Sequence, residues 1–399
     1  MLKTIKNNLI WIVFVPFIWI NTGMFWFEKG VSYTPAIILI FTLIYSVVFR
    51  KDLKDNLIDK KQDLFLKLLI IYLIICVIVY FLNGYSSRQI KAIGYSFLYL
   101  LFLPKKDLKK LPFKLTIVLS ATGFFVISFY QYFILNTPRV HGYINPIVFG
   151  SVVALVCCIS LLLMFASKEK TEKFVFFICF SLLLASTVYH LSRGVWLALI
   201  FVFCFLFFLN IKNNYLNHKK AMLFLLVIIL GVIAVNKDII WDRAVTNTSF
   251  EFSQIKKGDF KNSVGLRLQM FKSGFIIIED NLLFGVGDNF SEKIKNQYNN
   301  KQVDGALIEY PLSHFHNQYI DKFVKTGILG FLSLLSLILY PLIRALKYKK
   351  PSDYMLISIC SILFIAGLTD VPLNHGPILY YFFIMAYFLM NVDKKYQGG

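Results

Sequence analysis

The sequence predicts an all-α polytopic membrane protein with about 12 transmembrane helices, and three observations support this prediction. Hydrophobic residues make up 57% of the 399 residues, whereas a soluble domain typically has roughly 45–50%. Apolar runs of about 20 residues, the length of a helix that crosses a bilayer, recur along the whole chain. The runs are continuous rather than alternating, which predicts helices and excludes a transmembrane β-barrel.

Twelve apolar segments can be marked, and the whole chain, residues 1–399, is expected to form a single integral membrane domain. The segments are 8–24, 33–49, 65–83, 90–103, 113–135, 146–167, 173–190, 193–210, 220–236, 318–343, 354–370 and 376–391. The seventh and eighth segments are separated only by the turn around Arg193, so we expect them to be antiparallel neighbours.

The distribution of positive charge predicts the orientation of the chain. The formal net charge is +20, and most Lys and Arg residues lie in every second loop, as in 50–61, 105–110, 168–173 and 344–350. Short loops rich in Lys and Arg face the cytoplasm, so both termini are expected in the cytoplasm. Because the loops account for the excess charge, we expect membrane lipids and no nucleic acid as partners.

One long loop, residues 237–317 between the ninth and tenth segments, is expected on the opposite, periplasmic side. It contains apolar side chains such as Trp241, Phe271 and Ile277, which could form a small core. The stretch 266–279 has helical spacing of its apolar positions. A loop of this length without structure would be unusual, so we expect a small helical subdomain.

Polar side chains gather in the loops that are expected on that same side. Five of the six histidines lie there. The charged members are Arg139, Arg193, Arg267 and Asp370. Clustering of titratable groups indicates a functional site. His141 and His190 also have a simpler interpretation, which is a hydrogen bond to a loop carbonyl, and Asp370 is expected to orient an arginine or a histidine.

Arg193 lies in a turn of two or three residues between two apolar segments. A guanidinium is always charged and presents a planar fork that matches phosphate oxygens, so Arg193 is a candidate ligand of a phosphate or diphosphate. The alternative is an arginine that reaches lipid headgroups from the end of a helix. Both interpretations also apply to Arg139 and Arg267, and Arg267 could instead be a solvated helix residue.

The stretch 314–330 combines reactive side chains with the start of an apolar run. His314 and His316 lie two residues apart, Asn317 follows, and Gly327 and Gly330 open the apolar run. A histidine at the mouth of a membrane helix can exchange a proton near neutral pH. The alternative is a wet interfacial loop, since ionisable groups are common at membrane ends. The two glycines are interpreted as the close-packed start of the tenth helix.

No metal site is expected. The sequence has no paired Asp-x-Asp on that side of the membrane and no set of His and Glu at metal-ligand spacing. His314 and His316 are expected on different faces of a helix. The six cysteines all lie in apolar runs, so they are interpreted as small core residues.

Together these residues resemble the bacterial O-antigen ligase family, within the wider O-antigen ligase and polymerase superfamily. His316-Asn317, nine residues, Gly327, two residues and Gly330 match a signature of the ligases. The turn Leu-Ser-Arg-Gly-Val-Trp-Leu-Ala around Arg193 and the stretch Gly-Leu-Arg-Leu around Arg267 match two further positions. Twelve helices with a large periplasmic loop between the ninth and tenth are the family's topology.

The resemblance implies a metal-independent glycosyltransferase of the GT-C-like membrane type in the bacterial inner membrane. The donor would be a polysaccharide on undecaprenyl diphosphate, and the acceptor would be a sugar hydroxyl of the lipid A core oligosaccharide. Transfer would occur at the periplasmic face and would invert the anomeric centre, since no carboxylate is placed to act as a nucleophile. No cofactor is implied.

The resemblance also assigns roles to the candidate residues. Arg193 and Arg267 would stabilise the charge that develops on the diphosphate, and His316 would be the base for the acceptor hydroxyl or a diphosphate ligand. The supporting residues that would bind substrate or orient these groups are Arg139, Asn317, His314, Asp370 and His141.

Two other functions compete with this interpretation. The O-antigen polymerase of the same superfamily uses the same donor but extends a second lipid-linked chain. A transporter of lipid-linked sugars would place charges in broken helices or in internal repeats. The sequence shows no repeat, and its charges gather at one membrane surface, which favours the enzyme.

Overall fold

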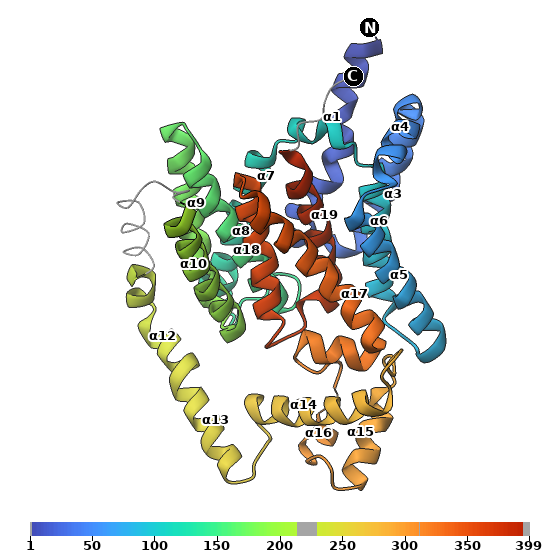
Figure 1. Cartoon of the computed structure of the whole chain (residues 1–399). Coiled ribbons are helices and arrows are strands. Elements are labelled where there is room, and N and C mark those ends of the chain that lie inside the picture. Colours follow the sequence, from blue (N-terminus) through green and yellow to red (C-terminus); the bar gives the residue numbers. More distant parts are fainter. Residues whose placement is uncertain (1, 214–229, 311, 394–399) are drawn as a thin grey trace.

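In the computed structural model, which describes residues 2–213, 230–310 and 312–393, the chain is built of helices, and these ranges contain no strand (Figure 1). The helices of the main bundle are α1 (Leu2–Asn21), α2 (Gly23–Trp26), α3 (Gly30–Val48), α4 (Arg50–Lys60), α5 (Leu64–Asn83), α6 (Ser87–Phe102), α7 (Phe113–Phe129), α8 (Pro146–Ala166), α9 (Lys170–Tyr189), α10 (Arg193–Asn213), α17 (Gln318–Tyr348), α18 (Pro351–Ala366) and α19 (Gly376–Val392). The predicted all-helical class is confirmed for these ranges.

Each predicted apolar segment except 220–236 coincides with a described helix, and most of 220–236 lies outside the described residues. Six of the described helices are long and apolar enough to cross a membrane, and four shorter apolar stretches accompany them. These observations support a multi-pass membrane protein. The number of twelve spans and the GT-C-like fold type stay predictions.

Polar residues mark the starts of several helices. Asp63 accepts hydrogen bonds from the backbone N–H groups of the first turn of α5, and Asn145 does the same for α8, where Pro146 follows at the first helical position. These residues satisfy N–H groups that a helix cannot pair internally. The apolar helices that follow these residues are buried or face lipid, according to their position in the bundle.

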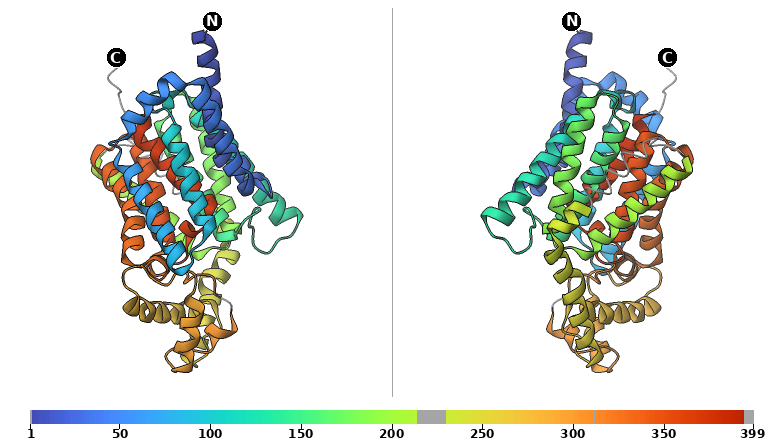
Figure 2. Two further views of the ribbon diagram at one scale, coloured as in Figure 1. Left: turned by 90° about the vertical axis from the view of Figure 1, so that its right-hand side faces the viewer. Right: turned by 90° about the vertical axis from the view of Figure 1, so that its left-hand side faces the viewer.

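The centre of the bundle is formed by α8 and α19, whose side chains are almost all buried. Helix α8 packs against α9 and α18, and α19 packs against α6 and α18. Helix α1 begins and α19 ends at the same end of the bundle, while the segment 237–310 lies at the other end (Figures 1 and 2). We call this second end the α14 end.

The segment predicted as a loop subdomain is helical where it is described. It contains α12 (Lys237–Trp241), α13 (Asn247–Lys256), α14 (Ser263–Asp280), α15 (Phe290–Asn299) and α16 (Ala306–Glu309). Helix α14 lies across the end of the bundle (Figure 1). Its buried side chains share one apolar cluster with Phe315 and with Val324 of α17. The segment therefore packs directly on α17, and its treatment as a separate periplasmic subdomain stays a prediction.

Helix α17 is not continuous, although the sequence suggested a helix with a close-packed start at its glycines. At Gly327 the backbone has φ 63° and ψ −169°, a conformation that essentially only glycine adopts. Residues 282–287 pack into this break, where Val286 N–H donates to the Val324 carbonyl at 2.8 Å and Ile328 N–H donates to the Leu282 carbonyl at 2.8 Å. The loop satisfies backbone groups that the break removes from the helix.

The Gly327→Ala variant is therefore expected to be strongly destabilised. A Cβ at this position would lie 2.1 Å from the Leu283 carbonyl oxygen, and the backbone conformation alone costs about 1–3 kcal/mol for a non-glycine residue. Gly94→Ala is the matched control, because a Cβ there meets only a Leu73 methyl at 4.0 Å. Melting temperatures in detergent would measure both effects, and equal melting temperatures for the two variants would contradict the expectation.

Candidate functional site

Two segments that are distant in the sequence bring His314, His316 and Asp370 together at the α14 end. His316 Nδ1 lies 3.5 Å and His314 Nε2 lies 3.7 Å from the same oxygen, Asp370 Oδ1. The two imidazole rings are edge to face, with centroids 4.3 Å apart. The carboxylate therefore lies beside both histidines, which is one of the two placements that the sequence left open. We call these three residues the histidine–aspartate cluster.

Asp370 is held in its ionised form. Burial raises the pKa of this carboxyl, but the neighbouring His316 and His314 and the hydrogen bond from the Val371 N–H outweigh burial, so the pKa lies below its usual range. The Val371 N–H donates to Asp370 Oδ1 at 2.8 Å. A negative charge therefore lies beside the two imidazole rings.

The backbone places His316 in an unusual conformation. His316 has φ 47°, in the left-handed region that few non-glycine residues adopt. The next residue, Asn317, is the cap of α17, and its Oδ1 accepts the N–H groups of Tyr319 and Ile320 at 3.0 and 3.1 Å. Its Nδ2 donates to the Leu368 carbonyl at 3.0 Å. Capping and this bond use both ends of the Asn317 side chain, and its predicted role of orienting His316 stays a prediction.

The expectation that His314 and His316 lie on different faces of a helix is wrong. Both residues precede α17 in non-helical backbone, and their rings converge on Asp370. One ligand atom from each member of the histidine–aspartate cluster lies within 4.8 Å of the others, so these side chains could hold a metal ion. The sequence did not reveal this set, because Asp370 lies more than 50 residues after the two histidines in the chain.

Arg193 lies at the start of α10 and contacts α13. Its Nη1 donates to Thr248 Oγ1 at 2.6 Å, and its Nη2 lies 3.3 Å from Glu251 Oε2. Both side chains of this ion pair are largely buried. An arginine that only reached lipid headgroups would not be paired in this way, so the contacts favour a fixed position for the guanidinium.

Two further arginines hold the turn between α9 and α10. Arg139 Nε donates to the His190 carbonyl at 2.8 Å, and Arg243 Nε donates to the Leu191 carbonyl at 3.3 Å. His190 itself is fully buried, and its Nδ1 lies 3.1 Å from the Val140 carbonyl. The simpler interpretation of His190, a hydrogen bond to a loop carbonyl, is therefore confirmed.

Arg267, on the first turns of α14, completes a group of four arginines. Burial lowers the pKa of Arg267; Asp370 raises it, and Arg193 lowers it. The pKa of Arg139 is lowered first by burial and then by Arg243. The start of α10 lies against the segment of Asp370, because a Cβ on Gly194 would be 2.0 Å from Thr369 Oγ1. Arg139, Arg193, Arg243 and Arg267 are called the arginine cluster below.

The two clusters form one site whose charge favours an anion. Glu251 pairs with Arg193, and Asp370 raises the pKa of both Arg139 and Arg267, so these two carboxylates are outnumbered by the four arginines. Arg267 Nε and Asp370 Oδ2 are buried and have no hydrogen-bond partner in the described part of the chain. The unpaired Arg267 Nε–H donor under net positive charge suits a phosphate oxygen, and the same charge disfavours a divalent cation beside Asp370.

The structure brings together six of the eight residues predicted for the site. They are His314, His316, Asp370, Arg139, Arg193 and Arg267. Asn317 is adjacent but caps a helix. Within the described ranges no hydrogen bond or ion pair joins the His141 ring to these residues. Its backbone N–H donates to Gln131 Oε1 at 3.0 Å, and its carbonyl accepts from the Ile144 N–H at 3.2 Å.

Sequence reasoning missed the residues that α13 and its neighbourhood supply. Arg243, Thr248 and Glu251 all contact the arginine cluster or its turn. They lie in the segment expected as a subdomain, in which charged residues are common and no motif distinguishes these three. Only the packing of α13 beside the start of α10 identifies them.

Because buried histidines of this region are neutral in the folded protein, we expect the protein to lose stability in acid. Burial lowers the pKa of His190 and of His314 to about 4, from a usual value of 6.5. The unfolded chain therefore binds protons first as the pH falls, and stability present above about pH 6.5 is lost between there and about pH 4. We expect the melting temperature to fall over this range.

Replacement of the fully buried His190 by glutamine separates the contribution of this histidine to the loss of stability in acid from the contribution of the carboxylates. The His190→Gln protein should show a shallower fall of melting temperature between pH 7 and pH 4 than the wild type. Glutamine can still donate to the Val140 carbonyl but does not titrate. Identical slopes in the two proteins would show that His190 does not contribute.

Comparison with known proteins agrees with the motifs. Residues 178–335 match the family model described as O-antigen ligase. This range contains Arg193, Arg267 and His316 and ends before Asp370. An uncharacterised protein of Haemophilus influenzae is 25% identical over 334 residues, which cover 80% of this chain and 81% of that protein. The family match confirms the predicted resemblance, and it supports the ligase and polymerase superfamily without separating the two activities.

Proposed function

We propose that this protein is an O-antigen ligase, which transfers a polysaccharide from undecaprenyl diphosphate to a sugar hydroxyl of the lipid A core. The observation that carries the proposal is the convergence of the histidine–aspartate cluster with the arginine cluster at the α14 end of the bundle. This end is opposite the start of α1 and the end of α19, which agrees with a periplasmic site and with the cytoplasmic termini that the loop charges predict.

The arginine cluster would bind the diphosphate of the donor. When the glycosyl–diphosphate bond breaks, negative charge grows on the leaving diphosphate oxygen. Arginines that are already held in place stabilise this charge more in the transition state than in the ground state. Arg267 and Arg193 are the main candidates, and Arg139 and Arg243 keep the turn between α9 and α10 in position.

His316 would act as the base. The acceptor hydroxyl oxygen forms a bond to the anomeric carbon, the bond to the diphosphate oxygen breaks, and the hydroxyl proton passes to His316 Nε2. Asp370, 3.5 Å from His316 Nδ1, would stabilise the imidazolium that results. The distance is long for a hydrogen bond, as is common before substrate binds. This direct displacement inverts the anomeric centre and needs no metal.

The lipopolysaccharide of a deletion strain tests the proposal. A ligase mutant should lose all O-antigen while its core stays intact, and the lipid-linked polysaccharide should accumulate. A single repeat unit left on the core would instead identify a polymerase, the second activity of the superfamily. Complementation by the intact chain would show that the phenotype belongs to this protein.

The break in α17 resembles a feature of transporters, which use broken helices to bind ions with freed backbone groups. In this protein the loop 282–287 occupies those backbone groups, as the bonds of Val286 and Ile328 show. The break therefore gives no support to transport. Transfer by purified protein without an ion gradient would exclude transport as the main function.

A further inference from the structure

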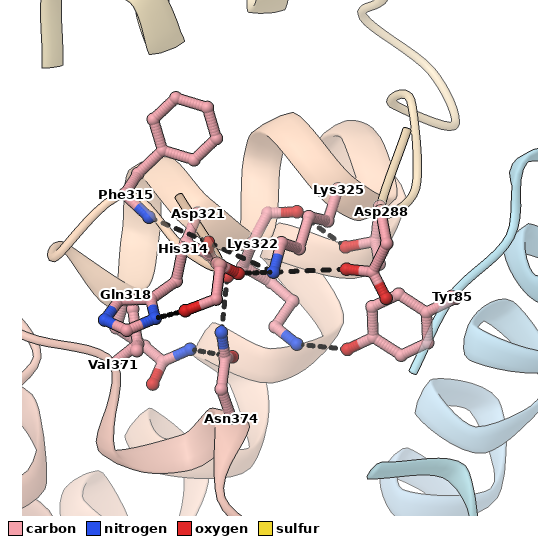
Figure 3. A network of polar contacts seen from close by, with 12 residues as sticks. Tyr85, Asp288, His314, Phe315, Gln318, Asp321, Lys322, Lys325, Val371 and Asn374 are labelled. Carbon is pink, nitrogen blue, oxygen red and sulfur yellow. Dashed lines mark hydrogen bonds and ion pairs between the residues drawn. The ribbon is translucent and has the colours of Figure 1, made fainter. Parts of the chain in front are cut away.

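Asp321, in the first turn of α17, connects the two chain segments that carry the histidine–aspartate cluster. Its side chain is completely buried. Its Oδ1 accepts the Phe315 N–H at 3.1 Å, and its Oδ2 accepts from Asn374 Nδ2 (Figure 3). Phe315 lies between His314 and His316, and Asn374 follows Asp370 by four residues. One carboxylate thus bridges the histidine loop and the segment of Asp370.

Lys325, one helical turn after Asp321, holds the same loop from a second point. Its Nζ donates to the Ser313 carbonyl at 2.9 Å and lies 3.5 Å from Asp321 Oδ1 (Figure 3). It is also 3.2 Å from Asp288 Oδ1, in the loop that follows α14. Ser313 and Phe315 flank His314, so the two charged residues fix the backbone on both sides of this histidine.

The remaining contacts strengthen the connection. Gln318 Nε2 donates to Asn374 Oδ1 at 2.9 Å, and the Leu373 N–H donates to Gln318 Oε1 at 2.7 Å. A buried ion pair contributes little to net stability, because the loss of hydration offsets the attraction between the charges. Its clearest consequence here is geometric, since it selects one arrangement of two segments that connect the long helices.

We propose that Asp321 and Lys325 are positioning residues, which hold the 313–316 loop so that His316 faces Asp370. This inference rests on the proposed function for its effect on transfer. The hold on the loop can be tested without any substrate. His316 has the left-handed backbone conformation described above, which surrounding contacts must maintain. Asp321 and Lys325 supply such contacts, because they bind the backbone of Phe315, which directly precedes His316, and of Ser313.

Two variants test the proposal, and one variant is a matched control. Asp321→Asn removes the charge and turns an amide toward the Asn374 amide or the Phe315 N–H. Lys325→Met removes the donor to the Ser313 carbonyl. Lys322→Met is the control, because Lys322 is on the same helix and fully buried, but its Nζ donates to Tyr85 Oη and Gln89 Oε1 instead of the histidine loop.

The first measurement is the rate at which diethyl pyrocarbonate modifies each histidine of the purified protein, read by peptide mass spectrometry. We expect Asp321→Asn and Lys325→Met to raise the modification rates of His314 and His316 severalfold. The rate at the fully buried His190 should stay as in the wild type, and Lys322→Met should change none of the three. Unchanged rates at His314 and His316 in both test variants would overturn the proposal.

The second measurement is transfer. A misplaced base slows the chemical step by up to about 100-fold, so kcat should fall at least about tenfold in both test variants while KM changes little. If modification rises but the wild-type protein shows no transfer, the proposed function fails and the hold on the loop stands. If modification rises and kcat is unchanged in an active enzyme, the positioning role is overturned.

A rise at His190 as well would show that a variant has unfolded. Asn374→Ala then decides, because Asn374 is only half-buried and its loss removes one bond to Asp321 and one to Gln318 but no charge. We expect a smaller rise at His314 and His316 with His190 unchanged. No rise at either histidine in this folded variant would overturn the proposal.

Discussion

Replacement of His316 by asparagine is expected to lower polysaccharide transfer by about 10²–10⁴-fold, which is the usual contribution of a general base. Asparagine tolerates the left-handed backbone of His316, at φ 47°, better than most residues. The change therefore removes the imidazole with little added strain. An amide cannot accept the proton of the acceptor hydroxyl. The rate would be measured with purified protein in liposomes that contain the lipid-linked donor and the lipid A core.

A matched control for this prediction is Lys301→Asn. Lys301 has a similar left-handed backbone, at φ 55°, and is exposed after α15. It should keep the wild-type rate and melting temperature. If His316→Asn and His316→Ala both transferred polysaccharide at the wild-type rate, the roles of His316 as a base and as a diphosphate ligand would both be wrong.

Arg267→Lys is expected to lower kcat about 10²–10³-fold, the effect of removing one donor to a developing negative charge. The lysine keeps the positive charge but lacks the planar fork that binds two phosphate oxygens. Arg267 is a sharper test than Arg193, because Arg193 is also paired with Glu251, and its replacement would disturb the packing of α13. The measurement is single-turnover transfer with saturating donor.

Arg88→Lys is the control for Arg267→Lys. Arg88 is exposed in the first turn of α6 and lies on the side of the membrane that loop charge predicts for the site. Its replacement should leave kcat and KM unchanged. Wild-type kcat in Arg267→Lys would show that charge alone suffices at this position and would contradict bidentate contact with diphosphate.

The apolar pattern determined most of the helices. The predicted segment 146–167 became α8 (Pro146–Ala166), and 376–391 became α19 (Gly376–Val392). These boundaries follow from local rules, since an apolar run between polar turns must form a helix in lipid. The pattern did not reveal the break of α17, because Gly327 is acceptable in a helix and only the loop 282–287 makes its left-handed conformation necessary.

The candidate site was determined in two different ways. His316, Arg193 and Arg267 stand in local patterns, so they could be identified in the chain itself. Glu251 and Thr248 are ordinary residues of a helical segment, and they matter because α13 packs beside the start of α10. A contact between segments more than 50 residues apart leaves no periodic signal in either one.

By itself, the sequence predicted helices from recurring apolar segments, charges that alternate between loops, and a collection of arginines and histidines in the loops of one side. Composition and period suffice for these properties, because each follows from the solvent around a single segment. Only the tertiary structure decided that His314 and His316 share Asp370, that Asp321 and Lys325 hold their loop, and that α17 breaks at Gly327. These features depend on which loops meet at the α14 end, and that meeting is fixed by the packing of α14, α17 and α18 together.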